Sequence, residues 1–307
     1  MPLLLPLLPL IAQVGPFATT PGAPRSTPFE QGVSRRKPVA TAQAPAAQPT
    51  DATPAQTTRP VPAAQTAKGK ECLAQVDDDA EAAADGAQGW LANGAKGPGE
   101  RAEAELCLGL AHSKLEDWSE AEQAFLAGRD AAGANRMLRA RLGAMAGSAA
   151  LAGGHDEAAL AALDAARADA TGLADAALTA GIALDRARAL VGLTRLDQAA
   201  TALAEARDAM PASPEAWLLS ATLSRRQGNL AQAQQQIERA AELMPVDPAI
   251  GLEAGVIAVL SGHEEAARKS WQSVIAAAPE SPEAATAKGY IAQLGPAPAA
   301  PATGTGR

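Results

Sequence analysis

The sequence predicts an all-α protein in which paired helices stack into one elongated solenoid. Two observations lead to this prediction. A set order of large, small and turn-forming residues recurs along the chain, and over residues 180–281 it returns every 34 residues. Aromatic residues make up only 3% of the 307 residues, and alanine supplies much of the apolar content. Such a composition suits thin layers of closely packed helices better than a large globular core.

The clearest unit runs from Pro214 to Asp247. It contains apolar residues that open a first helix, a small residue, a turn, the inner face of a second helix and a closing proline: Trp217, Leu218, Ala221, Gly228, Asn229, Ala233, Ile237, Ala240 and Pro245. This order resembles the tetratricopeptide repeat, a helix-turn-helix unit. The resemblance implies a right-handed α-solenoid that binds other proteins.

The chain begins with the apolar run MPLLLPLLPLIA, which is broken by Pro2, Pro6 and Pro9. The run is too short to cross a bilayer and resembles the hydrophobic region of a secretory signal. We therefore expect residues 1–20 to be a signal peptide, with cleavage between Ala12 and Thr20. The alternatives are a misplaced start codon or an unstructured apolar tip.

Residues 21–68 are rich in Pro and Ala, lack apolar periodicity and are expected to form a disordered linker. Residues 13–68 carry a net charge of +4, so residues 69–307 carry −12 of the total of −8. An acidic body repels phosphate backbones, which argues against a nucleic-acid partner, and no segment is long enough for a transmembrane span. The linker could tether the array to the cell envelope, with Ser34–Pro38 either touching anionic lipid or simply solvated.

The solenoid is expected over residues 69–294. It should consist of an atypical hairpin, five repeats and a capping helix: 71–93, 102–135, 140–173, 180–213, 214–247, 248–281 and 282–294. Six extra residues after 173 should lengthen either the loop or the next helix, and residues 295–307 are expected to form a disordered tail. Some units depart from the family pattern, as with Gly128 and Ser220, which leaves helix boundaries open.

The two cysteines, Cys72 and Cys107, lie 35 residues apart, about one repeat length. In a stacked array they would occupy equivalent places on neighbouring first helices. We predict a disulfide between them if the chain is exported, contributing about 3–4 kcal/mol to stability. The alternative is a pair of buried free thiols.

Catalytic signatures are absent from the sequence, which contains no HExxH, GxSxG, P-loop or GxGxxG motif. His155 and His263 occupy the same turn position in their repeats, and His112 has no partner histidine one helical turn away. The acidic run Asp77–Asp79 is expected to start a helix. We therefore predict neither an enzyme, nor a metal site, nor a cofactor.

The remaining candidate site is a concave groove, which the first helices line in this family. The residues that the register places there are Leu106, Leu110, Ser148, Leu151, Leu184, Arg188, Val191, Leu218, Thr222, Arg225, Leu252, Val256 and Val259. The carboxylate clamp of chaperone-binding members is missing, since its positions carry Leu106, Leu110 and Met145. We expect an apolar extended or helical segment with an acidic group near Arg188 and Arg225. Alternatively, these side chains pack neighbouring repeats or meet the chain's own tail.

The sequence thus predicts a non-catalytic adaptor, periplasmic or secreted, that binds a protein or peptide segment. A second hypothesis is an accessory subunit that presents substrates to an envelope enzyme or assembly machinery, as in cytochrome c maturation. A third is a self-associating structural array. The alternative location is the cytoplasm.

Overall fold

The computed structural model describes residues 66–295, so the signal-peptide prediction for residues 1–20 and the predicted tail lie outside the described residues. Thirteen α-helices, and no strand, occupy the described part. They are α2 (Ala67–Asp78), α3 (Ala80–Asn93), α4 (Pro98–Lys114), α5 (Trp118–Ala131), α6 (Arg136–Ala152), α7 (Asp156–Ala170), α8 (Ala176–Gly192), α9 (Leu196–Ala209), α10 (Pro214–Arg226), α11 (Leu230–Leu243), α12 (Pro248–Leu260), α13 (Glu264–Ala277) and α14 (Pro282–Leu294). None of the described helices is both long and apolar enough to cross a bilayer.

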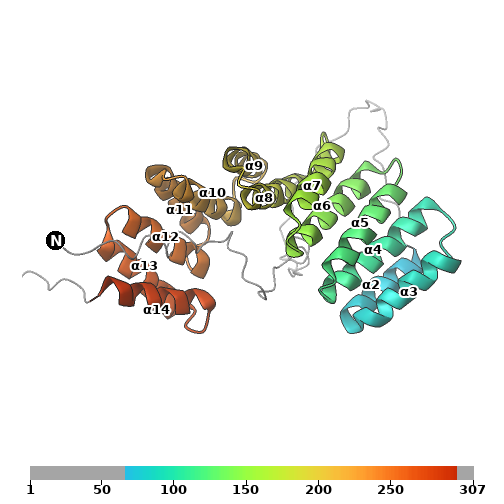
Figure 1. Ribbon diagram of the computed structural model, residues 1–307, viewed down its shortest axis with the longest axis horizontal. Helices are drawn as coiled ribbons and strands as arrows, with labels where there is room; N and C mark the ends of the chain where they lie inside the picture. Colours follow the sequence, from blue (N-terminus) through green and yellow to red (C-terminus); the bar gives the residue numbers. More distant parts are fainter. Residues whose placement is uncertain (1–65, 296–307) are drawn as a thin grey trace, which may run out of the picture.

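The helices pack as sequential antiparallel pairs, and each helix contacts the next one along the chain. In Figure 1 the pairs form an arch, with α2 and α14 at its two feet and α8 and α9 near its top. First helices also contact first helices, as in the pairs α6–α8, α10–α12 and α12–α14, whereas no two second helices share a comparable contact. The first helices therefore form the more closely spaced side of the array, here called the first-helix face.

Within each repeat, a small residue on the first helix receives a large residue from the second. A Cβ built on Gly109 would lie 2.5 Å from Phe125, and one on Gly147 would lie 2.4 Å from Leu163. Alanine plays the same part in the two middle repeats, where Ala187 shares a buried cluster with Leu203 and Ala221 with Ile237. The predicted alternation of small and large residues is confirmed as the contact that closes each hairpin.

The most demanding of these contacts lies between Gly255 and Trp271. A Cβ on Gly255 would lie 2.1 Å from the indole Nε1, which donates a hydrogen bond to the carbonyl of Leu252 at 3.1 Å. Trp271 is fully buried and cannot move aside freely. We expect Gly255→Ala to lower the free energy of unfolding by about 1–3 kcal/mol, measured by urea denaturation.

Gly289 provides a matched control on helix α14, since nothing lies within 4 Å of a Cβ built there. Gly289→Ala should raise stability by about 0.5–1 kcal/mol, because alanine is the better helix former. Equal effects of the two substitutions would contradict the packing argument.

Most of the extra residues in the early repeats lengthen first helices. Helices α4, α6 and α8 have 17 residues each, whereas α10 and α12 have 13. The longer helices begin four residues before the repeat boundaries that the register predicted. Four of the six residues after position 173 fall within α8, which begins at Ala176, and the other two lie in the loop before it.

One expectation about the acidic run was wrong in part. Asp77 and Asp78 end α2, and only Asp79 starts a helix, where its side chain accepts a hydrogen bond from the amide of Ala82 at 3.0 Å. The extended backbone of Asp79 (φ −155°) separates the two helices. Asp79 thus caps α3 in the usual way.

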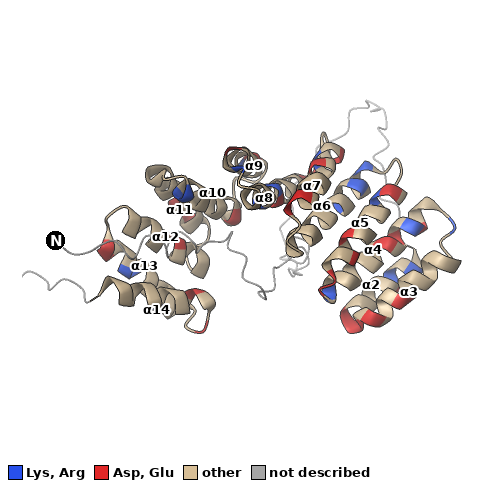
Figure 2. Cartoon of the chain, viewed as in Figure 1, with Lys and Arg blue, Asp and Glu red and all other residues tan. Residues whose placement is uncertain are grey.

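Charge is unevenly distributed over the described residues. Residues 66–135 hold 14 acidic and 6 basic side chains, a net charge of −8, whereas residues 136–295 hold 18 and 14, a net charge of −4. In Figure 2 acidic positions are marked along the ribbons of α2 to α5, interspersed with basic ones. In the rest of the array, ion pairs join neighbouring repeats, such as Arg167–Glu205 and Arg225–Glu253.

Candidate functional site

Two polar clusters lie on the first-helix face, and each spans three successive first helices. The first consists of Ser148 on α6, Asp185 and Arg188 on α8, and Glu215 on α10. The second consists of Arg225 on α10, Glu253 on α12 and Tyr290 on α14. They are called the Arg188 cluster and the Arg225 cluster below.

In the Arg188 cluster the guanidinium bridges two carboxylates. Its Nη1 donates to Asp185 at 2.6 Å and its Nη2 donates to Glu215, while the Ser148 hydroxyl donates to Asp185 at 2.6 Å. Burial by itself would lower the pKa of Arg188, but Asp185 and Glu215 outweigh it and raise that pKa. The side chain is one quarter exposed, so the cluster reaches the surface.

The Arg225 cluster is closed to solvent. The Arg225 side chain is 2% exposed and Glu253 3% exposed, and Nε of Arg225 donates to the Glu253 carboxylate at 2.6 Å. The two predicted groove arginines therefore differ: Arg188 is accessible, and Arg225 forms an internal ion pair.

The apolar residues predicted for the groove mostly pack the repeats together. Leu151, Leu184, Val191, Leu218 and Val256 are buried in clusters shared by neighbouring helices. The half-buried ones are Leu106, Leu110, Leu252 and Val259. The alternative interpretation, that these side chains join adjacent repeats, describes the buried residues. The half-buried ones keep part of their surface exposed.

Tyr290 carries a buried hydroxyl without a hydrogen-bond partner among the described residues. Its ring packs against Trp271 at a centroid distance of 5.1 Å. Burial raises the pKa of Tyr290, Arg225 opposes this shift and Glu253 adds to it. The folded state therefore favours the neutral phenol more than the unfolded state does.

Tyr290→Phe should raise the free energy of unfolding at neutral pH by about 1 kcal/mol, because it removes a buried hydroxyl that lacks a partner. In the wild type, stability should also fall as the pH rises above about 10, the pKa of the unfolded tyrosine, and this loss should shrink in the variant. Urea denaturation at neutral pH and above pH 10 tests both. A variant that is less stable at neutral pH would show that the hydroxyl has a partner.

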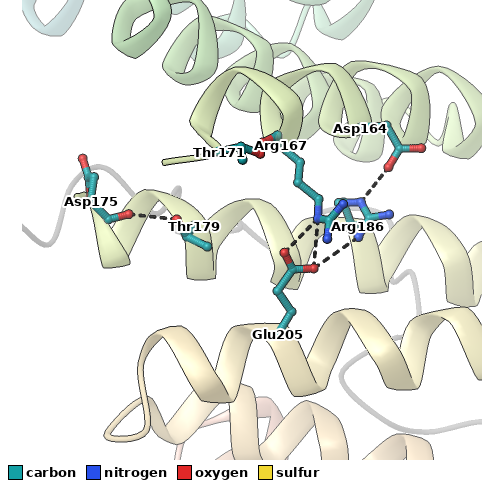
Figure 3. Close-up of polar contacts among 7 residues, drawn as sticks. All are labelled: Asp164, Arg167, Thr171, Asp175, Thr179, Arg186 and Glu205. Carbon is teal, nitrogen blue, oxygen red and sulfur yellow. Dashed lines mark hydrogen bonds and ion pairs between the residues drawn. The ribbon is translucent and has the colours of Figure 1, made fainter. Parts of the chain in front are cut away.

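Charged side chains also link the second helices, as Figure 3 shows. Arg167 of α7 donates to Glu205 of α9 at 2.8 Å, and Arg186 of α8 donates to Asp164 of α7 at 2.7 Å. Arg186 also lies 3.7 Å from Glu205. The network ties α7, α8 and α9 together, so its charges serve the fold.

The predicted disulfide between Cys72 and Cys107 is present and joins α2 to α4. His155 and His263 directly precede α7 and α13, as expected for turn residues. Within residues 66–295, no three His, Cys, Asp or Glu side chains gather as a metal ion would need.

Four residues of these clusters were not among the residues predicted from the sequence: Asp185, Glu215, Glu253 and Tyr290. Asp185 and Glu253 occupy the same register position two repeats apart, inside first helices that are otherwise mostly apolar. A carboxylate at this position was a readable signal, since a buried acid needs a cation nearby. Asp185 pairs with Arg188 three residues later on the same helix, whereas the partner of Glu253, Arg225, lies 28 residues away in the preceding repeat and could not be assigned from the sequence.

No protein-family model matches the chain, and no curated protein sequence matches it. Among solved structures, PilW, a widely conserved type IV pilus biogenesis factor, is 18% identical and covers 71% of this chain and 96% of its own, with a TM-score of 0.58. PilF from Pseudomonas aeruginosa is 14% identical, with coverages of 74% and 96% and a TM-score of 0.57. A tetratricopeptide repeat protein from Parabacteroides merdae is 15% identical, with coverages of 74% and 87% and a TM-score of 0.59. At these identities the comparisons show the fold alone: a tetratricopeptide-repeat array.

Proposed function

We propose that this chain, which has the tetratricopeptide-repeat fold, is a non-catalytic scaffold. It binds a protein segment on the first-helix face. The observation that carries the proposal is the Arg188 cluster. It holds the Arg188 side chain, one quarter exposed, between two carboxylates near the middle of the array, and the first helices α4 and α12 carry half-buried leucines such as Leu110 and Leu252. A segment that combines apolar side chains with an acidic group fits this surface.

The proposed location is the periplasm or another oxidising compartment. The disulfide between Cys72 and Cys107 supports it, because such bonds persist outside the reducing cytoplasm. Intact mass of the protein from its own cells, after free thiols are blocked, tests the location. If residues 1–20 are a signal peptide, we expect a mass that lacks the first 12 to 20 residues. Cys72 and Cys107 should then carry no blocking group, because they become free thiols only after reduction. A full-length mass with two blocked thiols would place the protein in the cytoplasm.

A second candidate function is an accessory subunit of an envelope assembly machinery or enzyme. The fold similarity to PilW, itself described as a pilus biogenesis factor, favours this candidate. Co-purification of a catalytic or assembly subunit with the native protein would distinguish it from a free-standing adaptor.

Self-association through the ends of the array is less favoured. The outward residues of α3 and α14 include exposed polar side chains such as Glu81, Asp85, Gln88 and Lys288. Polar end helices are typical of capped arrays that do not extend. A monomer in sedimentation at micromolar concentration would remove this function.

The binding face is tested by photo-crosslinking in the native cells. A photoreactive amino acid is placed at the exposed first-helix positions Arg141 and Glu215, and at the exposed second-helix positions Gln232 and Gln272 as controls. Crosslinks to one partner are expected from the first pair and not from the second. Crosslinks confined to the second-helix positions would reject the first-helix face. Replacing Arg225 is avoided, because its ion pair is internal.

A further inference from the structure

We propose that Glu215 is an internal stand-in for the partner's carboxylate, so that Arg188 binds an aspartate or glutamate of the partner by exchange with Glu215. This inference rests on the proposed function and adds a mechanism to it. It assigns three roles: Asp185 and Ser148 position the guanidinium, Arg188 binds, and Glu215 competes.

The two carboxylates bound to Arg188 differ in how firmly they are held. The Asp185 side chain is 9% exposed and also accepts the Ser148 hydroxyl, so it cannot leave without exposing a buried charge. The Glu215 side chain is 54% exposed, and Arg188 is its one ion-pair partner among the described residues. Only the Glu215 end of the cluster can therefore open at low cost.

Only the side chain of Glu215 has to move when it separates from Arg188. Glu215 lies in the first turn of α10, whereas Arg188 lies on α8, and these two helices are not among the first-helix pairs in close contact. Rotation of the Glu215 side chain into solvent thus needs no change in helix packing. A partner carboxylate could then occupy the vacated donor and form the same charge-assisted hydrogen bond.

The Arg225 cluster lacks an exposed carboxylate of this kind. Asp185 and Glu253 share one register position, and each pairs with an arginine, but both members of the Arg225–Glu253 pair are buried. Exchange is therefore possible at Arg188 and not at Arg225. A partner should depend on one arginine of the face, not on both.

The test uses purified full-length protein and short fluorescein-labelled peptides in which leucines flank a single glutamate at varied spacing. Glu215→Gln should tighten binding of the best glutamate peptide about two- to fivefold, as expected when a surface ion pair that competes with it is removed. The same peptide with glutamine should bind both proteins equally. Fluorescence anisotropy measures the affinities.

Glu283→Gln is the matched control. Glu283 follows a proline in the first turn of α14, as Glu215 does in α10, and it has no ion pair among the described residues. The Glu283→Gln substitution removes one negative charge, as Glu215→Gln does, and should leave the affinity for the glutamate peptide unchanged.

Three outcomes would overturn the exchange: no change with Glu215→Gln, an equal gain for the glutamine peptide, or no binding of any glutamate peptide to Glu215→Gln. If crosslinks to a partner on the first-helix face persist in that case, the scaffold function stands and only the exchange fails.

Discussion

Glu253→Gln is expected to lower the free energy of unfolding of the C-terminal repeats by about 3–5 kcal/mol. The substitution keeps the shape of the side chain but removes its charge, so the buried guanidinium of Arg225 loses the carboxylate of Glu253. Hydrogen exchange of the amides in α10 to α13 measures the effect, because loss of stability in a repeat array stays close to the site of change.

The intact Arg225–Glu253 pair should contribute little to the free energy of unfolding, although removing only one of its two charges should cost much stability. Replacing Arg225 by Met and Glu253 by Leu together should restore most of the stability, since two desolvated charges are removed at once. The exposed pair Arg239–Glu242 provides a control, and Glu242→Gln should change stability by less than about 1 kcal/mol. A double variant as unstable as Glu253→Gln would show that the ion pair is needed for the fold.

Replacing both Cys72 and Cys107 by alanine is expected to destabilise the first hairpin by about 4 kcal/mol, the amount that closing a loop of this length removes from the unfolded state. Besides the disulfide, α2 is attached to α4 by Glu103, which accepts hydrogen bonds from the amide and hydroxyl of Thr66. The apolar cluster under the hairpin is made largely of alanines. Amides of α2 and α3 should therefore exchange much faster, and those of α12 and α13 should not.

Reduction of the wild type with a dithiol provides the second arm of this experiment. It should reproduce the exchange pattern of the double variant and have no effect on that variant. Unchanged protection of α2 and α3 in both would show that packing alone holds the hairpin.

The helical pairs could be predicted from sequence because each depends on residues close together in the chain. The members of each pair, Gly147 with Leu163 and Gly255 with Trp271, lie 16 residues apart. In each pair the small residue accommodates the large one within a single hairpin, independently of the other repeats. Helix starts were less readable. The register placed repeat boundaries four residues inside α6 and α8, because a first helix can be extended at its N-terminus without disturbing the inner contacts.

The sequence by itself therefore determined the fold class, and it predicted the pairing of Cys72 with Cys107 that the structure contains. Only the tertiary structure decided which groove residues face solvent, and it separated Arg188 from Arg225. The partners of these arginines, Glu215 and Glu253, lie 27 and 28 residues away on the next first helix. Whether such a carboxylate is sealed or exposed depends on how closely two first helices approach, and that spacing is set by side chains of several repeats at once. The residue type gives the charge of a side chain, whereas its exposure to solvent depends on how the repeats pack in the array.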